Sequence, residues 1–251
     1  MGCRIIKGVQ KVESTKIENL IIESLKEMSE LVKNETCNSR IIMPHYRAKE
    51  DNDNTIRYSE QELKQIFLHT VETKSKMYYS VETPSEYVYS IKNSKVPEIK
   101  RLKEKDDHYG SARIDTSIYS KPDSKNLFCH IEFKHGNPDV NEIAKDFLRL
   151  THELGEADNN YFIHYVVRGS NKWKSETFPS LMDKYMKATK IVANEEKNLN
   201  KVWIYLMFVK IGKKKEVFVF KFNLEQLEKD FKRIQKYNEE EIRSLGWSIQ
   251  L

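Results

Sequence analysis

The sequence predicts an α/β fold for this chain of 251 residues. Two observations carry the prediction: apolar residues recur at helical spacing in some segments and alternate in others, and the two kinds of segment follow one another along the chain. Hydrophobic residues make up 39% of the chain, enough for a packed core. No internal repeat, low-complexity tract or long linker interrupts the pattern, so a single α/β domain with additions at both ends is expected.

The N-terminal part is predicted to contain two amphipathic helices. In residues 15–34, apolar side chains recur at steps of three and four with Glu and Lys between them. This spacing also suits pairing between helices, but it covers too few heptads for a coiled coil, and docking on the chain's own core is the preferred interpretation. After a polar loop, Ser59 and Glu62 have the spacing of a capping box and open a second helix before Leu63.

Strands and helices then alternate. Strands are predicted at residues 77–83, 112–119 and 127–134, and the charged stretch 92–107 is expected to be an exposed excursion. Gly136-Asn-Pro138 ends the third strand, and a helix follows from Val140 to near Gly155. The remaining predicted elements are a strand at 161–167, a helix at 178–192, strands at 202–209 and 216–222, and a helix at 224–237.

Composition and the absence of certain motifs argue against several classes of protein. The net charge of +5 is modest, the mean hydropathy is −0.70, and no apolar run is long enough for a membrane span or a secretory signal, so a cytoplasmic protein with no membrane partner is expected. The three cysteines are too widely spaced for a CxxC zinc site and are expected to be reduced. Phosphate-binding loops of the GxxxxGK[ST] or GxGxxG type and the HExxH zinc motif are absent, which argues against ATP, dinucleotide and zinc-hydrolase chemistry.

Charged residues interrupt two of the predicted strands. Asp115 lies in the strand 112–119, and Glu132 and Lys134 lie in the strand 127–134, where they share one face while Phe133 points to the other. If the strands pair, a carboxylate from each converges on one point beside an ammonium group. That arrangement suits a hard divalent cation and an activated water molecule, so these residues predict a hydrolytic metal site.

These residues resemble the signature of the PD-(D/E)XK nuclease superfamily, an Asp on one strand and Glu-x-Lys on the next. The order of elements over residues 57–168 is similar as well: a helix, a three-strand meander, a crossover helix and a fourth strand. The proline of the motif is absent, because Arg113-Ile114 precedes Asp115. The resemblance implies a three-layer, restriction-endonuclease-like core, here with an N-terminal helical extension at residues 1–55 and a nuclease-like domain at 56–251, of which 169–251 would be a C-terminal elaboration.

The resemblance also implies roles for the residues. Asp115 and Glu132 would bind Mg²⁺, for which Mn²⁺ can substitute, with the Phe133 carbonyl as a third ligand, and Lys134 would position the attacking water and offset charge on the phosphorane. Many members add an acid from the preceding helix. Helical geometry turns Glu60 toward the apolar face, whereas Glu62 is used by the capping box, so Glu60 is the candidate auxiliary ligand. The alternatives are a first-turn acid at Glu60 and a plain salt bridge between Asp115 and Lys134.

Further candidates lie near the motif. Arg113, His135 and Lys145 could contact nucleic acid, although a loop histidine is the preferred interpretation of His135 and a solvated helix face that of Lys145. Glu82 or Arg113 could support the site. The run Lys213-Lys-Lys215 is expected to be a hairpin turn.

The leading functional hypothesis is a magnesium-dependent endonuclease that cuts DNA in preference to RNA. The resemblance suggests bacterial restriction or antiviral defence, with a homodimer or larger defence complex as possible assemblies. Two alternatives stay open. One is a nuclease-fold subunit that no longer cuts and serves in binding or assembly, and the other is an RNA-cutting effector that needs an activating partner.

Overall fold

A seven-stranded mixed sheet runs through the centre of the protein, in the strand order β11-β10-β9-β8-β7-β6-β3. A computed structural model describes residues 3–33, 41, 45–47, 54–56, 59–92, 96–101, 112–123, 125–153, 159–169, 178–193, 198–211, 215–230 and 248–249. The strands of the sheet are β3 (Tyr78–Pro84), β6 (Arg113–Tyr119), β7 (Leu127–His135), β8 (Asn160–Gly169), β9 (Val202–Ile211), β10 (Lys215–Asn223) and β11 (Ser248–Ile249).

The first three strands of this sheet form an antiparallel meander. β3 pairs with β6 and β6 with β7, after which β8 and β9 lie parallel to β7 and each other. β10 and β11 then return antiparallel. Two separate antiparallel pairs complete the strands: β1 (His45–Arg47) with β2 (Asn54–Ile56), and β4 (Tyr87–Lys92) with β5 (Val96–Arg101).

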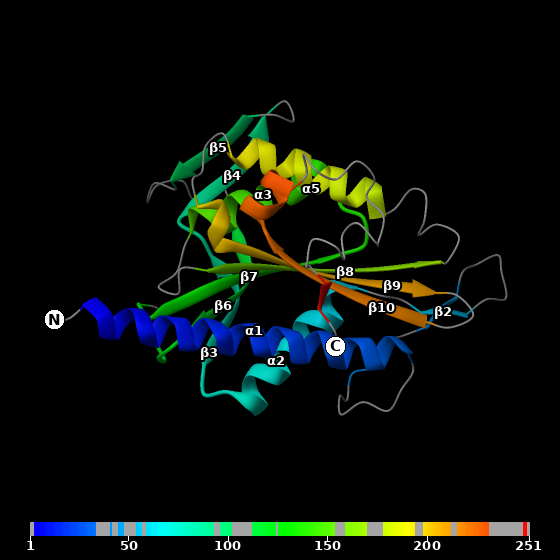
Figure 1. Ribbon diagram of the computed structural model, residues 1–251, viewed down its shortest axis with the longest axis horizontal. Helices are drawn as coiled ribbons and strands as arrows, with labels where there is room; N and C mark the ends of the chain where they lie inside the picture. The colour runs from blue at the N-terminus through cyan, green and yellow to red at the C-terminus, as the bar shows by residue number, and fades with distance from the viewer. Residues whose placement is uncertain are drawn as a thin grey trace.

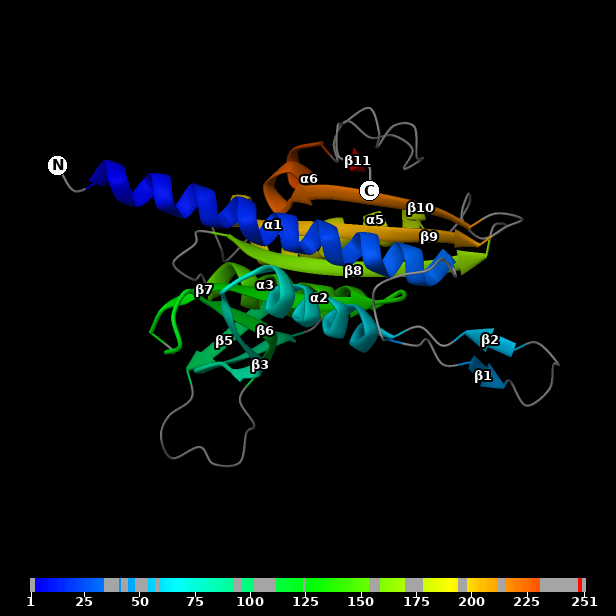
Figure 2. The same ribbon diagram turned by 90° about the horizontal axis from the view of Figure 1, so that it is seen from below.

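Helices cover both faces of the sheet (Figure 1). On one face lie α1 (Cys3–Lys33) and α2 (Glu60–Lys74), which Figure 2 shows in front of the strands. On the other lie α3 (Val140–His152), α5 (Phe178–Ala193) and the short α6 (Leu224–Asp230), with one 3₁₀ turn, η2 (Leu199–Lys201), before β9. The parallel step from β7 to β8 requires a crossover, and α3 supplies it.

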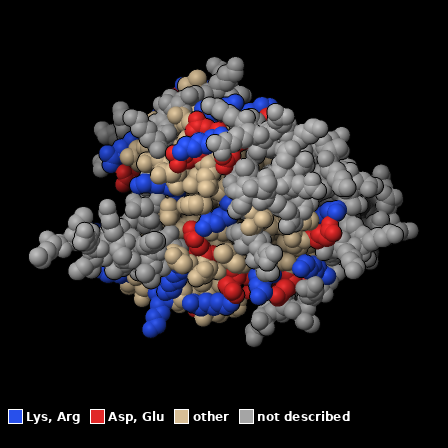
Figure 3. Space-filling view, viewed as in Figure 1, with Lys and Arg blue, Asp and Glu red and all other residues tan. Residues whose placement is uncertain are grey.

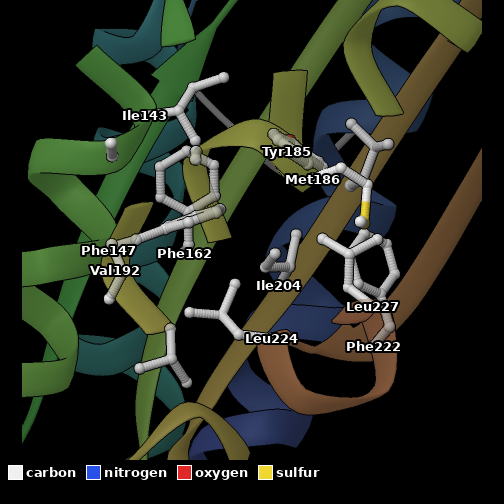
Figure 4. Packing of buried hydrophobic residues seen from close by; sticks show 14 of the residues in the cluster. Ile143, Phe147, Phe162, Tyr185, Met186, Val192, Ile204, Phe222, Leu224 and Leu227 are labelled. Carbon is white, nitrogen blue, oxygen red and sulfur yellow. The ribbon is translucent and has the colours of Figure 1, made fainter. Parts of the chain in front are cut away.

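Two hydrophobic clusters separate the layers. In β8, Tyr161, Ile163 and Tyr165 pack with α1 and α2, whereas Phe162 and Val166 pack with α3 and α5. This alternation follows from the two-residue period of a strand, and it leaves β8 buried on both faces. Figure 4 shows the cluster to which Phe162 belongs, where Phe162 lies among side chains of α3, α5, α6, β9 and β10.

The α/β class and the order of elements predicted from the sequence are confirmed. α2, β3, β6, β7, α3 and β8 are the predicted helix, three strands, helix and strand, and the C-terminal strands extend the same sheet. The helix α1 begins at Cys3, twelve residues before the predicted start at 15. Its apolar side chains from Ile17 to Val32 belong to the cluster shared with α2 and the sheet, although the boundary at 55/56 stays a prediction.

One expectation is wrong. Residues 96–101, predicted to lie in an exposed excursion, form β5, which pairs with β4 in an antiparallel hairpin. Charged side chains obscured this strand in the sequence. They form ion pairs at the surface of the hairpin: Glu98 with Lys92 and Lys100, and Arg101 with Glu86. Tyr89 of β4, by contrast, is buried against α3. Residues 93–95 and 102–107 of the stretch, and 231–237 of the predicted last helix, lie outside the described residues.

Two smaller expectations concern membranes and cysteines. No helix among the described residues combines the length and apolar character needed to cross a membrane. Cys129 is a free cysteine at full burial, and burial raises the pKa of its thiol, so this side chain packs as an apolar group. Cys37 lies outside the described residues.

Candidate functional site

The central feature of the site is a place where two neighbouring strands separate. β6 and β7 are paired from Tyr119 opposite Leu127 to Thr116 opposite Ile131. Beyond that point β6 stays with β3 as far as Arg113, and β7 stays with β8 as far as His135. Asp115 on β6 and Glu132 to Lys134 on β7 therefore stand at this β6–β7 opening.

Asp115 spans the opening. Its Oδ2 accepts a hydrogen bond of 2.8 Å from the backbone N–H of Phe133, in place of a strand-to-strand backbone bond. Its Oδ1 lies 3.4 Å from Nζ of Lys64, a buried lysine of α2 that also contacts Glu82 Oε1 at 2.7 Å. Asp115 is therefore fixed from both sides, by β7 and by α2.

Glu132 is a buried carboxylate on the face of the sheet that α3 covers. Its side chain is 4% exposed and pairs with Nη1 of Arg149, which also donates a 2.9 Å hydrogen bond to the carbonyl oxygen of Arg113. Burial, and then the negative charge of Asp146, raise the pKa of Glu132 well above its usual range, while Arg149 opposes the shift.

Lys134 lies on the same face and pairs with a different residue of α3. Its Nζ is 2.9 Å from Oδ2 of Asp146, whose side chain is 8% exposed. Burial by itself would lower the pKa of Lys134, but the charge of Asp146 and the hydrogen bond to it raise the pKa, so Lys134 stays a cation at neutral pH. The alternative of a plain salt bridge between Asp115 and Lys134 is not what the structure has, because each pairs with a residue of a helix.

Glu62 has the capping role predicted for it, whereas the role of Glu60 as an auxiliary metal ligand stays a prediction. The carboxylate of Glu62 accepts a hydrogen bond of 3.0 Å from the backbone N–H of Ser59, as a capping box requires. Glu60 is half-buried, and burial followed by the negative charge of Asp115 raises its pKa, with the charge of Lys134 opposing. Glu60 is thus within electrostatic range of the residues at the opening.

We call five carboxylates around the opening the acidic cluster: Glu60, Glu82, Asp115, Glu132 and Asp146. Three basic residues, Lys64, Lys134 and Arg149, lie among them, so the carboxyl groups outnumber the basic groups by two. Burial raises the pKa of Asp146 too, so half-buried and buried members of the cluster resist ionisation together. A divalent cation would relieve this crowding.

The donor set fits a hard divalent cation in chemistry and in charge, because carboxylate oxygens are the ligands that Mg²⁺ prefers. It is not preassembled as a metal cage. Within the described residues, no three Asp, Glu, His or Cys side chains lie close enough together to hold one ion. Asp115 and Glu132 could serve as ligands only after loosening their contacts with Lys64 and Arg149.

Sequence reasoning missed three members of the site: Lys64, Asp146 and Arg149. A signal was available for two of them, since Lys64 and Asp146 occupy buried positions of amphipathic helices, whereas Arg149 is only partly buried. Lys64 follows Leu63 in α2, and Asp146 sits beside the fully buried Phe147 in α3. Charged residues at buried helix positions require a partner of opposite charge, and the Asp and Glu-x-Lys strands are where such partners were expected.

The three residues predicted to contact nucleic acid lie on three different elements. Arg113 and Lys145 are exposed, at the start of β6 and on the outer side of α3. His135 is half-buried at the end of β7, and its ring lies 4.6 Å from that of Tyr165, on the face of the sheet that α2 covers. β9 and β10 pair up to Ile211 and Lys215 as a hairpin, while Lys213 and Lys214 lie outside the described residues.

The surface charge is mixed. On the face shown in Figure 3, the described basic and acidic residues lie interspersed, with uncharged surface between them. Several are paired with each other, such as Lys92 with Glu98. The described part of this face therefore carries no broad field of one sign, in keeping with the net charge of +5.

Comparison of the chain with protein-family models, with curated proteins and with solved structures finds no match. The geometry of the opening between β6 and β7 is therefore the basis for the functional argument.

Proposed function

We propose that the protein is a magnesium-dependent nuclease of the PD-(D/E)XK type, which hydrolyses phosphodiester bonds in DNA. One observation carries the proposal: Asp115 and the Glu132-Phe133-Lys134 run meet where β6 and β7 separate, with Asp115 bonded to the backbone of Phe133. A carboxylate pair and an ammonium group at the end of paired strands match the chemistry of metal-assisted hydrolysis.

The topology supports the same proposal. The order α2, β3, β6, β7, α3, β8, with an antiparallel meander followed by a parallel strand, is the order that a restriction-endonuclease-like core requires. The β4–β5 hairpin is then an insertion between the first two strands of the meander. Because one fold can host many functions, the proposal depends on the residues of the site, and the topology only supports it.

Asp115 and Glu132 are the residues that would hold the ion, with the Phe133 carbonyl and Glu60 as further ligands. A bound Mg²⁺ supplies Lewis acidity toward a phosphodiester oxygen and lowers the pKa of a coordinated water. The acidic cluster provides the negative charge that retains it, because carboxylates outnumber cations around the opening.

Lys134 stabilises developing negative charge on the phosphorane and orients the attacking water. It acts as a cation rather than as a base, because its pKa is raised by Asp146. Asp146 is the positioning residue for Lys134, at 2.9 Å, and holds the ammonium group from α3. Arg113, His135 and Lys145 are proposed as contacts to the nucleic-acid backbone.

The biological setting belongs to the proposal as well. A cytoplasmic role in restriction or antiviral defence is what the resemblance implies, and cutting both strands of a duplex would require two sites, as a homodimer would provide. The resemblance also favours DNA over RNA as the substrate.

The test is cleavage of supercoiled plasmid, linear duplex, single-stranded DNA and RNA in magnesium, in manganese and in chelator. We expect metal-dependent DNA cutting that falls by about 10²–10³-fold in Lys134→Met, since a preorganised cation contributes on that order. Glu132→Gln should abolish both cutting and manganese binding. Glu86→Gln is the matched control, because Glu86 forms an exposed ion pair with Arg101 at the β4–β5 hairpin. This variant should cut DNA as the wild type does.

A second function has a specific observation in its favour. Asp115, Glu132 and Lys134 all have partners of opposite charge in the described structure, as they would in a nuclease-fold subunit that binds or assembles without cutting. Such a protein would cleave none of the four substrates and bind no manganese in calorimetry. Cleavage of RNA alone, or only with cell extract present, would instead identify the RNA-cutting effector.

A further inference from the structure

Arg149 is the cation nearest to the central carboxylate of the site. Its guanidinium, on the last turn of α3, contacts Glu132 Oε1 through Nη1 and lies 3.8 Å from Asp146 Oδ1 through the same nitrogen. The Arg149 side chain is 14% exposed and that of Glu132 is 4% exposed, so the pair is largely shielded from water.

Glu132 requires this positive charge in the ion-free protein. Asp146 and Asp115, which also act on Glu132, are both negative, and Lys134, the other cation within range, is paired with Asp146. A buried carboxylate without a cation is strongly unfavourable, so Glu132 must be neutralised by Arg149, by a proton or by a metal ion. A divalent ion on Glu132 and the guanidinium in its present place would be like charges in direct proximity, in a medium that screens them poorly.

The guanidinium is also incompletely satisfied where it lies. The contacts of Arg149 with acceptors use Nη1, and its Nε is buried without a hydrogen-bond partner in the described structure. The Tyr89 ring lies 5.9 Å from the guanidinium carbon and offers an aromatic face, and the Arg113 carbonyl at 2.9 Å is a neutral acceptor. The Tyr89 ring and the Arg113 carbonyl therefore offer the Arg149 guanidinium interactions that do not involve Glu132.

We propose that Arg149 is an exchangeable counter-ion for Glu132: it occupies the carboxylate in the ion-free protein, and a divalent cation must displace it to bind. The proposal rests on the metal site of the proposed function and adds its regulation. Arg149 lowers the affinity of the site for metal and keeps the ion-free site paired and folded.

Manganese binding and thermal unfolding of the whole chain test this without relying on cleavage. In Arg149→Met, a side chain of similar length without charge, the ion-free protein should unfold about 5 °C or more below the wild type, because Glu132 loses its counter-charge. Manganese should bind at least about tenfold more tightly, since no guanidinium has to be displaced. Manganese should also raise the unfolding temperature more than in the wild type.

Arg101→Met is the matched control, because Arg101 also pairs with a glutamate, but at the surface of the hairpin. It should leave both the unfolding temperature and the manganese affinity unchanged. If Arg149→Met does not fold, the double variant Glu132→Gln/Arg149→Met removes both charges together, and it should fold at nearly the wild-type temperature and show no response to manganese.

The outcomes separate this proposal from the proposed function. Equal manganese affinity in the wild type and Arg149→Met would overturn the exchange while leaving the metal site in place. Binding of manganese by neither protein would overturn both. Binding by Arg149→Met alone would support the exchange in its strongest form, with Arg149 closing the site in the resting protein.

Discussion

Lys64 joins two carboxylates that stand across from each other on neighbouring strands. Glu82 lies opposite Asp115, between the pairs Val81–Thr116 and Thr83–Ile114, and both acids contact Lys64. Glu82 has a φ of +51°, a backbone conformation that is unusual for a residue other than glycine. Such strain persists where surrounding contacts enforce it and collects at functional sites, which is consistent with the place of Glu82 beside Asp115.

His130 shows how burial at this scale makes stability depend on pH. The side chain is 4% exposed, and its Nδ1 lies 2.8 Å from Ser117 Oγ. Burial, together with the charge of Arg149, lowers the pKa of His130 to about 4. A histidine in an unfolded chain has a pKa of about 6.5, so the folded state is disfavoured as the pH falls from about 6.5 toward about 4.

We therefore predict that His130→Gln reduces the loss of stability in acid. The free energy of unfolding of the wild type should decline relative to the variant by up to about 3 kcal/mol between near-neutral pH and about pH 4. Urea unfolding at a series of pH values measures this. Two curves that run parallel over that range would show that His130 does not titrate as its surroundings indicate.

At the scale of elements, α3 connects the halves of the site. One face of the helix packs into the cluster of Figure 4 through Ile143 and Phe147, and the same helix carries Asp146 and Arg149 to the β6–β7 opening. The β4–β5 hairpin packs on the end of α3, where the Tyr89 hydroxyl contacts the Glu153 carboxylate and lies 2.9 Å from Nδ1 of His152. The position of α3 thus determines which cations reach Glu132 and which acid reaches Lys134.

The turn between β7 and α3 depends on Gly136. Its φ is +79°, its N–H donates to the Tyr165 carbonyl at 3.1 Å, and its own carbonyl lies 3.0 Å from Nε2 of His164. A Cβ at this position would meet no atom within 4 Å, so the cost of a side chain is conformational rather than steric.

Gly136→Ala should consequently destabilise the protein by about 1–2 kcal/mol, the penalty for an ordinary residue in left-handed backbone. Chemical denaturation provides the measurement. Gly136→Asn is the matched variant and should lose less, because Asn tolerates this conformation better. A loss as large in Asn as in Ala would point to a different cause, such as the exclusion of any side chain from the turn.

At the scale of the whole molecule, α1 is part of the core that supports the sheet. Ile17, Ile21, Leu25, Met28 and Val32 are fully buried and share a cluster with α2 and with strands β7 to β10. Figure 2 shows α1 extended across the strands on the side of α2. The layer that holds Lys64 and Glu60 in α2 is therefore itself held in part by α1.

Leu25→Ala should lower the free energy of unfolding by about 2–5 kcal/mol, since it removes a fully buried leucine and leaves a cavity. Lys26→Ala, on the exposed side of the same helix, should change it by less than about 0.5 kcal/mol. Denaturant titration of both proteins compares them. Equal small effects would mean that α1 contributes little to the folded core.

The sequence by itself determined the α/β class, the order of elements and the two strands that bear the motif. These features follow from local periodicity: alternation assigned Ile131 and Phe133 to one face and Glu132 and Lys134 to the other, and the structure has them so. Capping chemistry likewise separated Glu62 from Glu60. The strands β1, β2, β4, β5 and β11 were not predicted, and in β5 exposed charges concealed a paired strand.

The tertiary structure alone decided which charges face one another. Lys64 is 51 positions from Asp115 in the chain, and Arg149 is 17 from Glu132, so no local pattern could match them. Their pairing depends on how α2 and α3 pack against opposite faces of the sheet. The shifts in pKa at Glu132, Lys134 and Asp146 arise from burial and from charges brought together by that packing, which is why only the folded protein defines the electrostatics of the site.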